Sequence, residues 1–345
     1  YLPKARSTSG LSAIPDGVAL YGFLVRQQNT TVKTPEEIYQ TGLKEVARIG
    51  GIMDSIKNQV GFKGDLKAFF DYMKTDKQFM PYHTPKEILA AFANIQKKMT
   101  PNLKKMFINA PKTPFEIRQT EDYRAATASA EYMQGSADGK RPGIFYIPIL
   151  DAKTFNITSG MESLFLHEAI PGHHYQISLQ QENTLLPKFR RFAFYNAYVE
   201  GWALYCESLG KALGFYTNPY QYMGALGDEM HRAIRLVVDV AIHTKNMTRE
   251  QAIKYMMDHE AISEQAAVAE IERYMAMPAQ ALGYKVGAMK IQELRIKYQT
   301  QWGNKFSIPQ FHEQILKDGA MPLGILEQKM DNLGKYVLTG GTPTP

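Results

Sequence analysis

The sequence HEAIPGHHYQ at residues 167–176 places histidines and a glutamate around a helix breaker, directly after the apolar run SLFL at 163–166. That run is typical of a buried helix. In a His-Glu-x-x-His helix the two histidines are four residues apart, bind one zinc ion from one face, and leave the glutamate to activate water. Here the next histidines come six and seven residues after His167. An undisturbed helix would turn His173 about 120° away and carry His174 roughly 10 Å along the axis.

Pro171 and Gly172 interrupt such a helix. Proline lacks the N–H that a helix needs and clashes with the preceding turn, and glycine adopts backbone angles that other residues avoid. We therefore interpret this pair as a bulge that takes up two residues and brings His173 to the position of the second histidine. Two alternatives stay open: His174 occupies that position, or the helix ends at Ile170 and both histidines lie in a polar turn.

A second stretch, YVEGWALYCE at residues 198–207, places Glu200 in an otherwise apolar and aromatic helix. An unpaired carboxylate there would cost several kcal/mol, so a partner is expected. Two histidines and one glutamate leave the fourth zinc position open, as catalytic sites do. Gly201 would let a neighbouring backbone or a substrate approach closely. The alternative is a buried Glu200 paired with Arg190, Arg191 or a tyrosine.

Four motifs in this order resemble the bacterial family of unknown function 885: HEAIPGHHYQ, VEGWALYCE, RAIRLVVDVAIH at 232–243, and ERYMAMPAQALGYKVG at 272–287. The resemblance extends from YLPKAR at the start to the helix that contains Lys290. It implies a zincin-like metallopeptidase fold that is mainly α (α+β), a helical bundle with a small β-sheet beside the metal-binding helix. It also implies a lipoprotein in the periplasm or cell envelope.

The leading hypothesis is a zinc-dependent peptidase of the gluzincin type. The Zn²⁺ ligands would be His167, His173 and Glu200, with Glu168 as general base. A second hypothesis is a metal-dependent amidase or deacylase that acts on small amides in a closed pocket. A third is a catalytically inactive binding protein of the cell envelope, in which the Pro-Gly insertion keeps His173 from the metal.

The resemblance also suggests residues that act on the substrate. Tyr284 would donate to the oxyanion of the transition state, and Arg273 would grip a substrate carboxylate bidentately. Asp239 and His243 are four apart and would either orient a ligand or pair with one another. Further candidates are Tyr274 and Lys285 as substrate-binding residues, and Arg232 and Arg235 as rivals of Arg273.

Composition narrows the possible partners. The 345 residues include 40 basic and 34 acidic side chains, a formal net charge of +6, but these charges are scattered. No recognition motif or basic stripe accompanies them, so a nucleic-acid partner is not expected. No stretch approaches the roughly 18 apolar residues of a membrane span, and the first residues show no signal-peptide pattern. A peptide or a small amide is the expected substrate.

The chain is predicted to form a single zincin-like catalytic region over residues 1–345. Within it we expect a helical part at 1–110, a metal-site core at 111–300, and a C-terminal helix with a mobile polar tail at 301–345. By the resemblance, this is the C-terminal part of a longer protein, and a lipid anchor would lie in the missing N-terminal part.

Local patterns predict the individual elements. Residues 21–25 read as a short extended segment, and residues 115–117 and 143–148 read as strands because they are aromatic and β-branched. Pro148 favours an edge position for the second strand, where a zincin could hold an extended substrate. After Glu200 the chain is predicted to be almost wholly helical. Capped helices are expected near 34–60, 65–73, 84–99, 219–244, 248–257 and 263–277, and another from 278.

Overall fold

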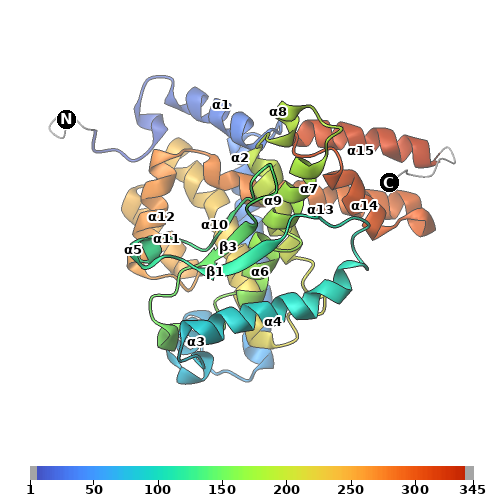
Figure 1. Cartoon of the computed structure of the whole chain (residues 1–345). Helices are drawn as coiled ribbons and strands as arrows, with labels where there is room; N and C mark the ends of the chain where they lie inside the picture. Colours follow the sequence, from blue (N-terminus) through green and yellow to red (C-terminus); the bar gives the residue numbers. More distant parts are fainter. Residues whose placement is uncertain (1–5, 339–345) are drawn as a thin grey trace. The chain divides into compact units, whose positions relative to one another are not determined.

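The structure, a computed structural model, describes residues 6–338 and is mainly helical with one small sheet (Figure 1). This confirms the mainly α (α+β) class. The end of the predicted polar tail, residues 339–345, lies outside the described residues. Among the described helices, none has the length and apolar character needed to cross a membrane.

The chain forms two compact units. Unit 1 comprises the residues up to Lys74 together with Leu226–Val286, and unit 2 comprises Thr75–Ala225 and the residues from Gly287 onward. These boundaries differ from those of the predicted parts 1–110, 111–300 and 301–345. The prediction of a single catalytic region stays a prediction.

Unit 1 is built from helices. Thr34 begins α2 with the expected capping box, because its hydroxyl accepts from the Glu37 N–H and the Glu37 carboxylate accepts from the Thr34 N–H at 2.7 Å. The elements are η2 (Leu11–Ala13), α1 (Gly17–Asn29), α2 (Pro35–Gln59), α11 (Arg249–His259), α12 (Glu264–Ala276), η5 (Gln280–Leu282), and most of α3 (Leu66–Thr75) and α10 (Pro219–Thr244).

The extended segment predicted at residues 21–25 is wrong, because these residues lie in α1. Tyr21 and Val25 are fully buried and four apart, whereas Phe23 between them is exposed. That spacing is helical, but a run of five apolar residues is too short to separate the two periods.

Unit 2 contains the sheet and the predicted metal helices. Its elements are η3 (Lys77–Phe79), α4 (Pro85–Leu103), β1 (Phe115–Gln119), α5 (Asp122–Ala125), β2 (Glu131–Met133), β3 (Gly143–Ile147), η4 (Ala152–Thr154), α6 (Met161–Glu168), α7 (His173–Glu182), α8 (Lys188–Arg191), α9 (Asn196–Glu207), most of α13 (Gly283–Trp302), η6 (Gly303–Lys305), α14 (Ile308–Leu316) and α15 (Leu323–Leu338).

The sheet has the strand order β1-β3-β2, with β3 parallel to β1 and antiparallel to β2. The edge position predicted for residues 143–148 is therefore wrong. All five residues of β3 are buried between its two neighbours, and Pro148 follows the strand without interrupting its pairing. The two edge strands are β1 and β2. Strand β2 was not predicted, because its three residues carry too short a pattern to be recognised from sequence.

The helices that carry the candidate ligands pack directly on one another. Helix α6 lies against α4 and α9, and α7 lies against α9 and α14 (Figure 1). Gly201 of α9 meets Gly287 of α13 so closely that a Cβ added to Gly201 would lie 2.5 Å from the Gly287 Cα. The close approach expected at Gly201 is thus made by a neighbouring backbone.

Candidate metal centre

The HEAIPGHH stretch folds as two helices joined by a sharp break. Helix α6 ends at Glu168, α7 begins at His173, and the peptide bond between Ile170 and Pro171 is cis. A Cβ on Gly172 would lie 1.9 Å from the His167 carbonyl oxygen, so only glycine fits. The break is therefore longer than the predicted two-residue bulge, yet it places His173 beside His167.

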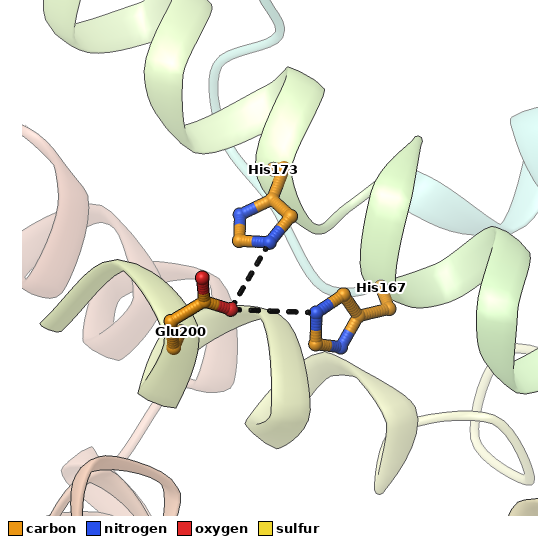
Figure 2. Close-up of side chains that lie close together, drawn as sticks. All are labelled: His167, His173 and Glu200. Atoms are coloured by element: carbon orange, nitrogen blue, oxygen red, sulfur yellow. Dashed lines mark ion pairs between the residues drawn. The ribbon is translucent and has the colours of Figure 1, made fainter. Parts of the chain in front are cut away.

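Three side chains from three helices converge at this break. His167 comes from α6, His173 from α7 and Glu200 from α9, and Figure 2 shows them pointing toward one another. Glu200 Oε2 lies 3.6 Å from His167 Nε2 and 3.3 Å from His173 Nε2. Their ligand atoms all lie within 4.8 Å of one another. Glu200 does not pair with Arg190 or Arg191, the alternative partners suggested by the sequence.

The spacing of these atoms fits a zinc ion. A tetrahedral zinc with bonds of about 2.1 Å separates its ligand atoms by about 3.4 Å, close to both measured N···O distances. Glu200 Oε2 is buried and accepts no hydrogen bond from any described residue. Burial alone would raise the pKa of Glu200, but the two imidazoles outweigh it and hold that pKa well below its usual range. The carboxylate is therefore ionised and can bind a cation.

Glu207 is a functional candidate that the sequence reasoning missed. One of its carboxylate oxygens lies 2.7 Å from His167 Nδ1, on the side of the ring opposite Nε2. Burial would lower the pKa of His167, but the carboxylates of Glu200 and Glu207 outweigh it and raise this pKa to about 10. The stretch VEGWALYCE contained a signal for this role. Glu207 comes seven residues after Glu200, and residues seven apart lie on one helix face.

Glu168 is the last residue of α6 and is buried beside its neighbour His167. Burial raises the pKa of this carboxyl, and the imidazoles of His167 and His173 oppose the rise.

His174 lies outside the cluster of His167, His173 and Glu200. Its Nδ1 is 3.0 Å from the Tyr132 hydroxyl, and its ring packs on Phe115 with centroids 4.5 Å apart. Burial lowers the pKa of His174 to about 4, so the ring is neutral. His174 ties α7 to β2, whereas His173 faces Glu200.

A known protein family matches nearly the whole chain. The family described as bacterial protein of unknown function (DUF885) matches residues 1–330. The chain belongs to this family. No curated protein matches it.

Two solved structures resemble this DUF885 chain. One is a "putative lipoprotein" from Colwellia psychrerythraea, with 38% sequence identity and a TM-score of 0.93, which covers 97% of this chain. The other, a "putative lipoprotein" of unknown function from Shewanella oneidensis, has 21% identity and a TM-score of 0.80 over 95% of this chain, and shows the fold alone. The DUF885 chain spans 58% and 61% of the lengths of these two proteins.

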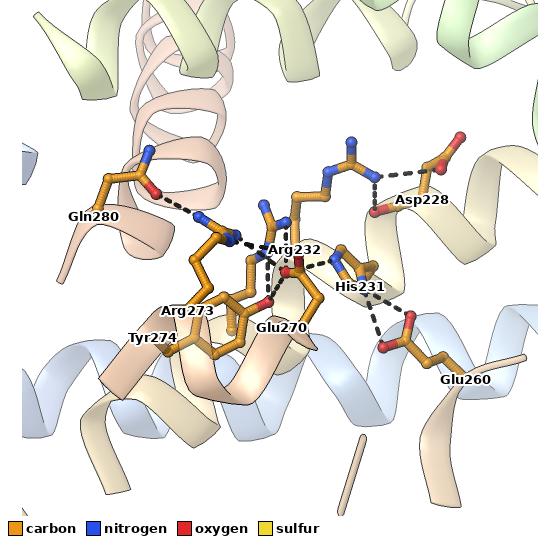
Figure 3. Close-up of polar contacts among 9 residues, drawn as sticks. Asp228, His231, Arg232, Glu260, Glu270, Arg273, Tyr274 and Gln280 are labelled. Carbon is orange, nitrogen blue, oxygen red and sulfur yellow. Dashed lines mark hydrogen bonds and ion pairs between the residues drawn. The ribbon is translucent and has the colours of Figure 1, made fainter. Parts of the chain in front are cut away.

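The predicted substrate residues of this DUF885 chain lie in unit 1, in a polar cluster around Glu270 (Figure 3). Arg273 and Arg235 each donate to Glu270 Oε2 at 3.0 Å. The Tyr274 hydroxyl donates to the same carboxylate and accepts from Arg235 Nε at 2.9 Å. Arg232 instead donates to Asp228.

The remaining candidates also have partners within unit 1. Lys285 pairs with Glu229 at 2.6 Å and with Glu45 at 2.9 Å, and the Tyr284 ring lies under the Arg235 guanidinium. These contacts describe how unit 1 is held together. The substrate and oxyanion roles of Tyr284, Lys285, Arg273 and Tyr274 stay predictions.

Asp239 and His243 each bind other groups of unit 1. Asp239 accepts from the Tyr21 hydroxyl at 2.5 Å and from the Ala279 N–H at 3.0 Å, and burial raises its pKa to about 7. His243 accepts from the Leu11 N–H and donates to the Tyr274 carbonyl. Their role in orienting a metal ligand stays a prediction.

Proposed function

We propose that this chain is the catalytic region of a zinc-dependent peptide hydrolase. The observation that carries the proposal is the convergence of His167 Nε2, His173 Nε2 and Glu200 Oε2, with both N···O separations close to those of a tetrahedral zinc site. Two imidazoles and one carboxylate leave a fourth position for water or substrate, the arrangement of catalytic sites.

Each residue of the centre would have a distinct role. A bound zinc ion would supply Lewis acidity toward the scissile carbonyl and lower the pKa of water. His167, His173 and Glu200 would hold the ion, and Glu207 would orient His167 through Nδ1. Glu168 would accept a proton from the attacking water and deliver it to the leaving amine.

The position of β2 supports an extended peptide as the substrate. A strand edge with unpaired N–H and C=O groups binds a peptide main chain by strand addition. Strand β2 lies beside the start of α7, since the Tyr132 hydroxyl is 3.0 Å from Nδ1 of His174, the residue that follows His173. A peptide bound along β2 would run past the start of α7. A small amide would need no such strand.

We further propose a location in the cell envelope. The two similar structures are both described as a "putative lipoprotein", and no described helix of this chain could span a membrane. A periplasmic location of this chain would be consistent with them.

The test separates metal binding from turnover. Zinc content and affinity would be measured for the wild type, Glu168→Gln, His173→Gln and His174→Gln, all purified without chelator or nickel. Turnover would be followed by mass spectrometry on a mixed peptide library and on a set of small N-acyl amides. We expect His173→Gln to lose zinc and activity, and Glu168→Gln to keep zinc but lose peptide hydrolysis.

His174→Gln is the matched control, because it changes the same residue type one position along and is expected to retain zinc. Loss of zinc in Glu168→Gln would make Glu168 a ligand and contradict its role as base. Cleavage of the small amides alone would favour the amidase hypothesis. Zinc binding without any turnover would favour the inactive binding protein.

A further inference from the structure

The connection between α7 and α9 exposes an unusual amount of apolar surface. Leu185 is 94% exposed, Phe189 75%, Phe194 64% and Phe192 42%. We call residues 184–194 the α8 surface, because α8 lies at its centre. Single exposed apolar side chains are common, but four within ten residues of one short segment indicate an interaction site.

The α8 surface is held firmly from inside by polar groups. The Gln180 amide donates to the carbonyls of Arg190 and Ala193, both at 2.9 Å. Arg190 donates to the Asp318 carbonyl at 2.8 Å, and Arg191 donates to the Gln181 carbonyl at 2.8 Å. Polar side chains thus anchor the segment while aromatic ones face outward. This reverses the usual arrangement of a water-exposed surface element.

The α8 surface is also positively charged. It contains Lys188, Arg190 and Arg191 and no acidic residue. Both arginines donate to backbone carbonyls, which are uncharged and leave the positive charge of each guanidinium uncancelled.

The acidic residues that flank this surface are engaged elsewhere. The Glu182 carboxylate accepts from the backbone N–H groups of Lys112 and Thr113, at 2.9 and 2.7 Å. Asp318 pairs with Lys329 at 2.7 Å. Within residues 184–194 all three charged side chains are cationic, and together with the exposed phenylalanines they complement a partner that is both anionic and apolar.

We propose that the α8 surface docks on an anionic lipid bilayer. Leu185, Phe189 and Phe194 would enter the boundary between headgroups and acyl chains, where these apolar side chains are removed from water. Lys188 and the two arginines would attract the headgroup phosphates. This proposal does not depend on the proposed peptide hydrolysis.

Vesicle co-sedimentation tests the proposal. The wild type would be mixed with vesicles of phosphatidylcholine plus phosphatidylglycerol, and with vesicles of phosphatidylcholine alone. We expect binding to the anionic vesicles that weakens with salt, and a loss of about tenfold or more in the triple variant Leu185→Ser, Phe189→Ser, Phe194→Ser. Lys188→Glu should weaken binding to the anionic vesicles specifically.

The matched control is a triple variant of other exposed apolar residues in unit 2, Ile108→Ser, Tyr123→Ser and Leu150→Ser, which should bind vesicles as the wild type does. A Phe189→Trp variant gives a second readout that leaves the patch apolar. Its fluorescence should shift to shorter wavelength with anionic vesicles and be quenched by brominated lipid.

Several results would overturn the proposal. They are equal binding to neutral vesicles, no binding of the wild type, and unchanged binding by the first triple variant. A wild-type dimer that this variant converts to monomer would assign the α8 surface to a second copy of the chain. Reduced peptide kcat/KM with unchanged vesicle binding would assign it to the substrate.

Discussion

Glu207 illustrates how a single residue shapes the candidate centre without touching the metal position. The His167 ring presents Nε2 to Glu200 and Nδ1 to Glu207. A carboxylate at Nδ1 fixes the tautomer and orientation of the ring and raises its basicity as a ligand. Glu207 itself lies in the same helix as the candidate ligand Glu200, so α9 supplies both.

We expect Glu207→Gln to weaken zinc binding by about tenfold to 100-fold while the protein stays folded. The amide oxygen can still accept from Nδ1, but the negative charge that strengthens Nε2 as a ligand is gone. Competition with a chromophoric chelator would measure the affinity. Glu162→Gln is the control, because Glu162 lies in α6 and accepts from the Tyr216 N–H. Equal affinity for wild type and Glu207→Gln would contradict the assignment.

At the scale of elements, the centre depends on how closely α9 approaches α13. Gly201 and Gly287 let the two helix backbones touch one residue after Glu200. A Cβ on Gly287 would lie 1.8 Å from the Ala197 carbonyl oxygen. Because backbone cannot move aside as a side chain can, any larger residue must push the helices apart.

We expect Gly287→Ala to displace α9, lower stability by about 1–3 kcal/mol and weaken zinc binding. Thermal unfolding and zinc titration would measure the two effects. Gly227→Ala in α10 is the matched control, since nothing lies within 4 Å of its added Cβ. That variant should be unchanged or more stable, because alanine favours a helix by roughly 0.5–1 kcal/mol over glycine. Similar behaviour of the two variants would show that the crossing is not tightly packed.

For the molecule as a whole, buried neutral histidines link stability to pH. His312 of α14 donates from Nδ1 to the Met106 carbonyl and accepts at Nε2 from the Tyr205 hydroxyl, both at 2.8 Å. Burial lowers the pKa of His312 from 6.5 to about 3. The unfolded chain therefore binds a proton at a pH where the folded chain does not.

We expect the free energy of unfolding to fall as pH drops from about 6.5 toward 3, with His312 contributing about 2 kcal/mol of the loss at pH 5. Chemical denaturation at pH 7.5 and pH 5 would measure it. His312→Gln cannot titrate, so this variant should be less stable at pH 7.5 yet lose less on acidification. An identical pH dependence in both proteins would show that His312 is not responsible.

Much of the fold follows from local sequence. Thr34-Pro35-Glu36-Glu37 predicts the start of α2 because a cap, a first-turn proline and a third-position glutamate act within one turn. Similar capping residues at the N-terminus predict α4, α11 and α12. The short elements were misread: residues 21–25 are helical, and β2 was not foreseen. Over three to five residues the helical and the strand periodicity of apolar side chains cannot be separated, so tertiary packing decides whether the segment is a helix or a strand.

The candidate ligands could also be chosen from sequence, since His167, His173 and Glu200 are chemically suited residues in patterns that ordinary helices do not explain. What brings them together is tertiary. The break before His173 is stabilised by contacts outside the motif, including the Trp202 indole N–H, which donates to the Pro171 carbonyl at 2.9 Å.

Sequence alone therefore determined the capped helices, the family and the residue types of the centre, because these depend on interactions within a few turns. Only the tertiary structure decided that His173 and not His174 faces Glu200, that Glu207 contacts His167, and that β3 lies between β1 and β2. These choices depend on which helix face meets which neighbour. That is set by the packing of segments distant in the chain, such as α6 against α9.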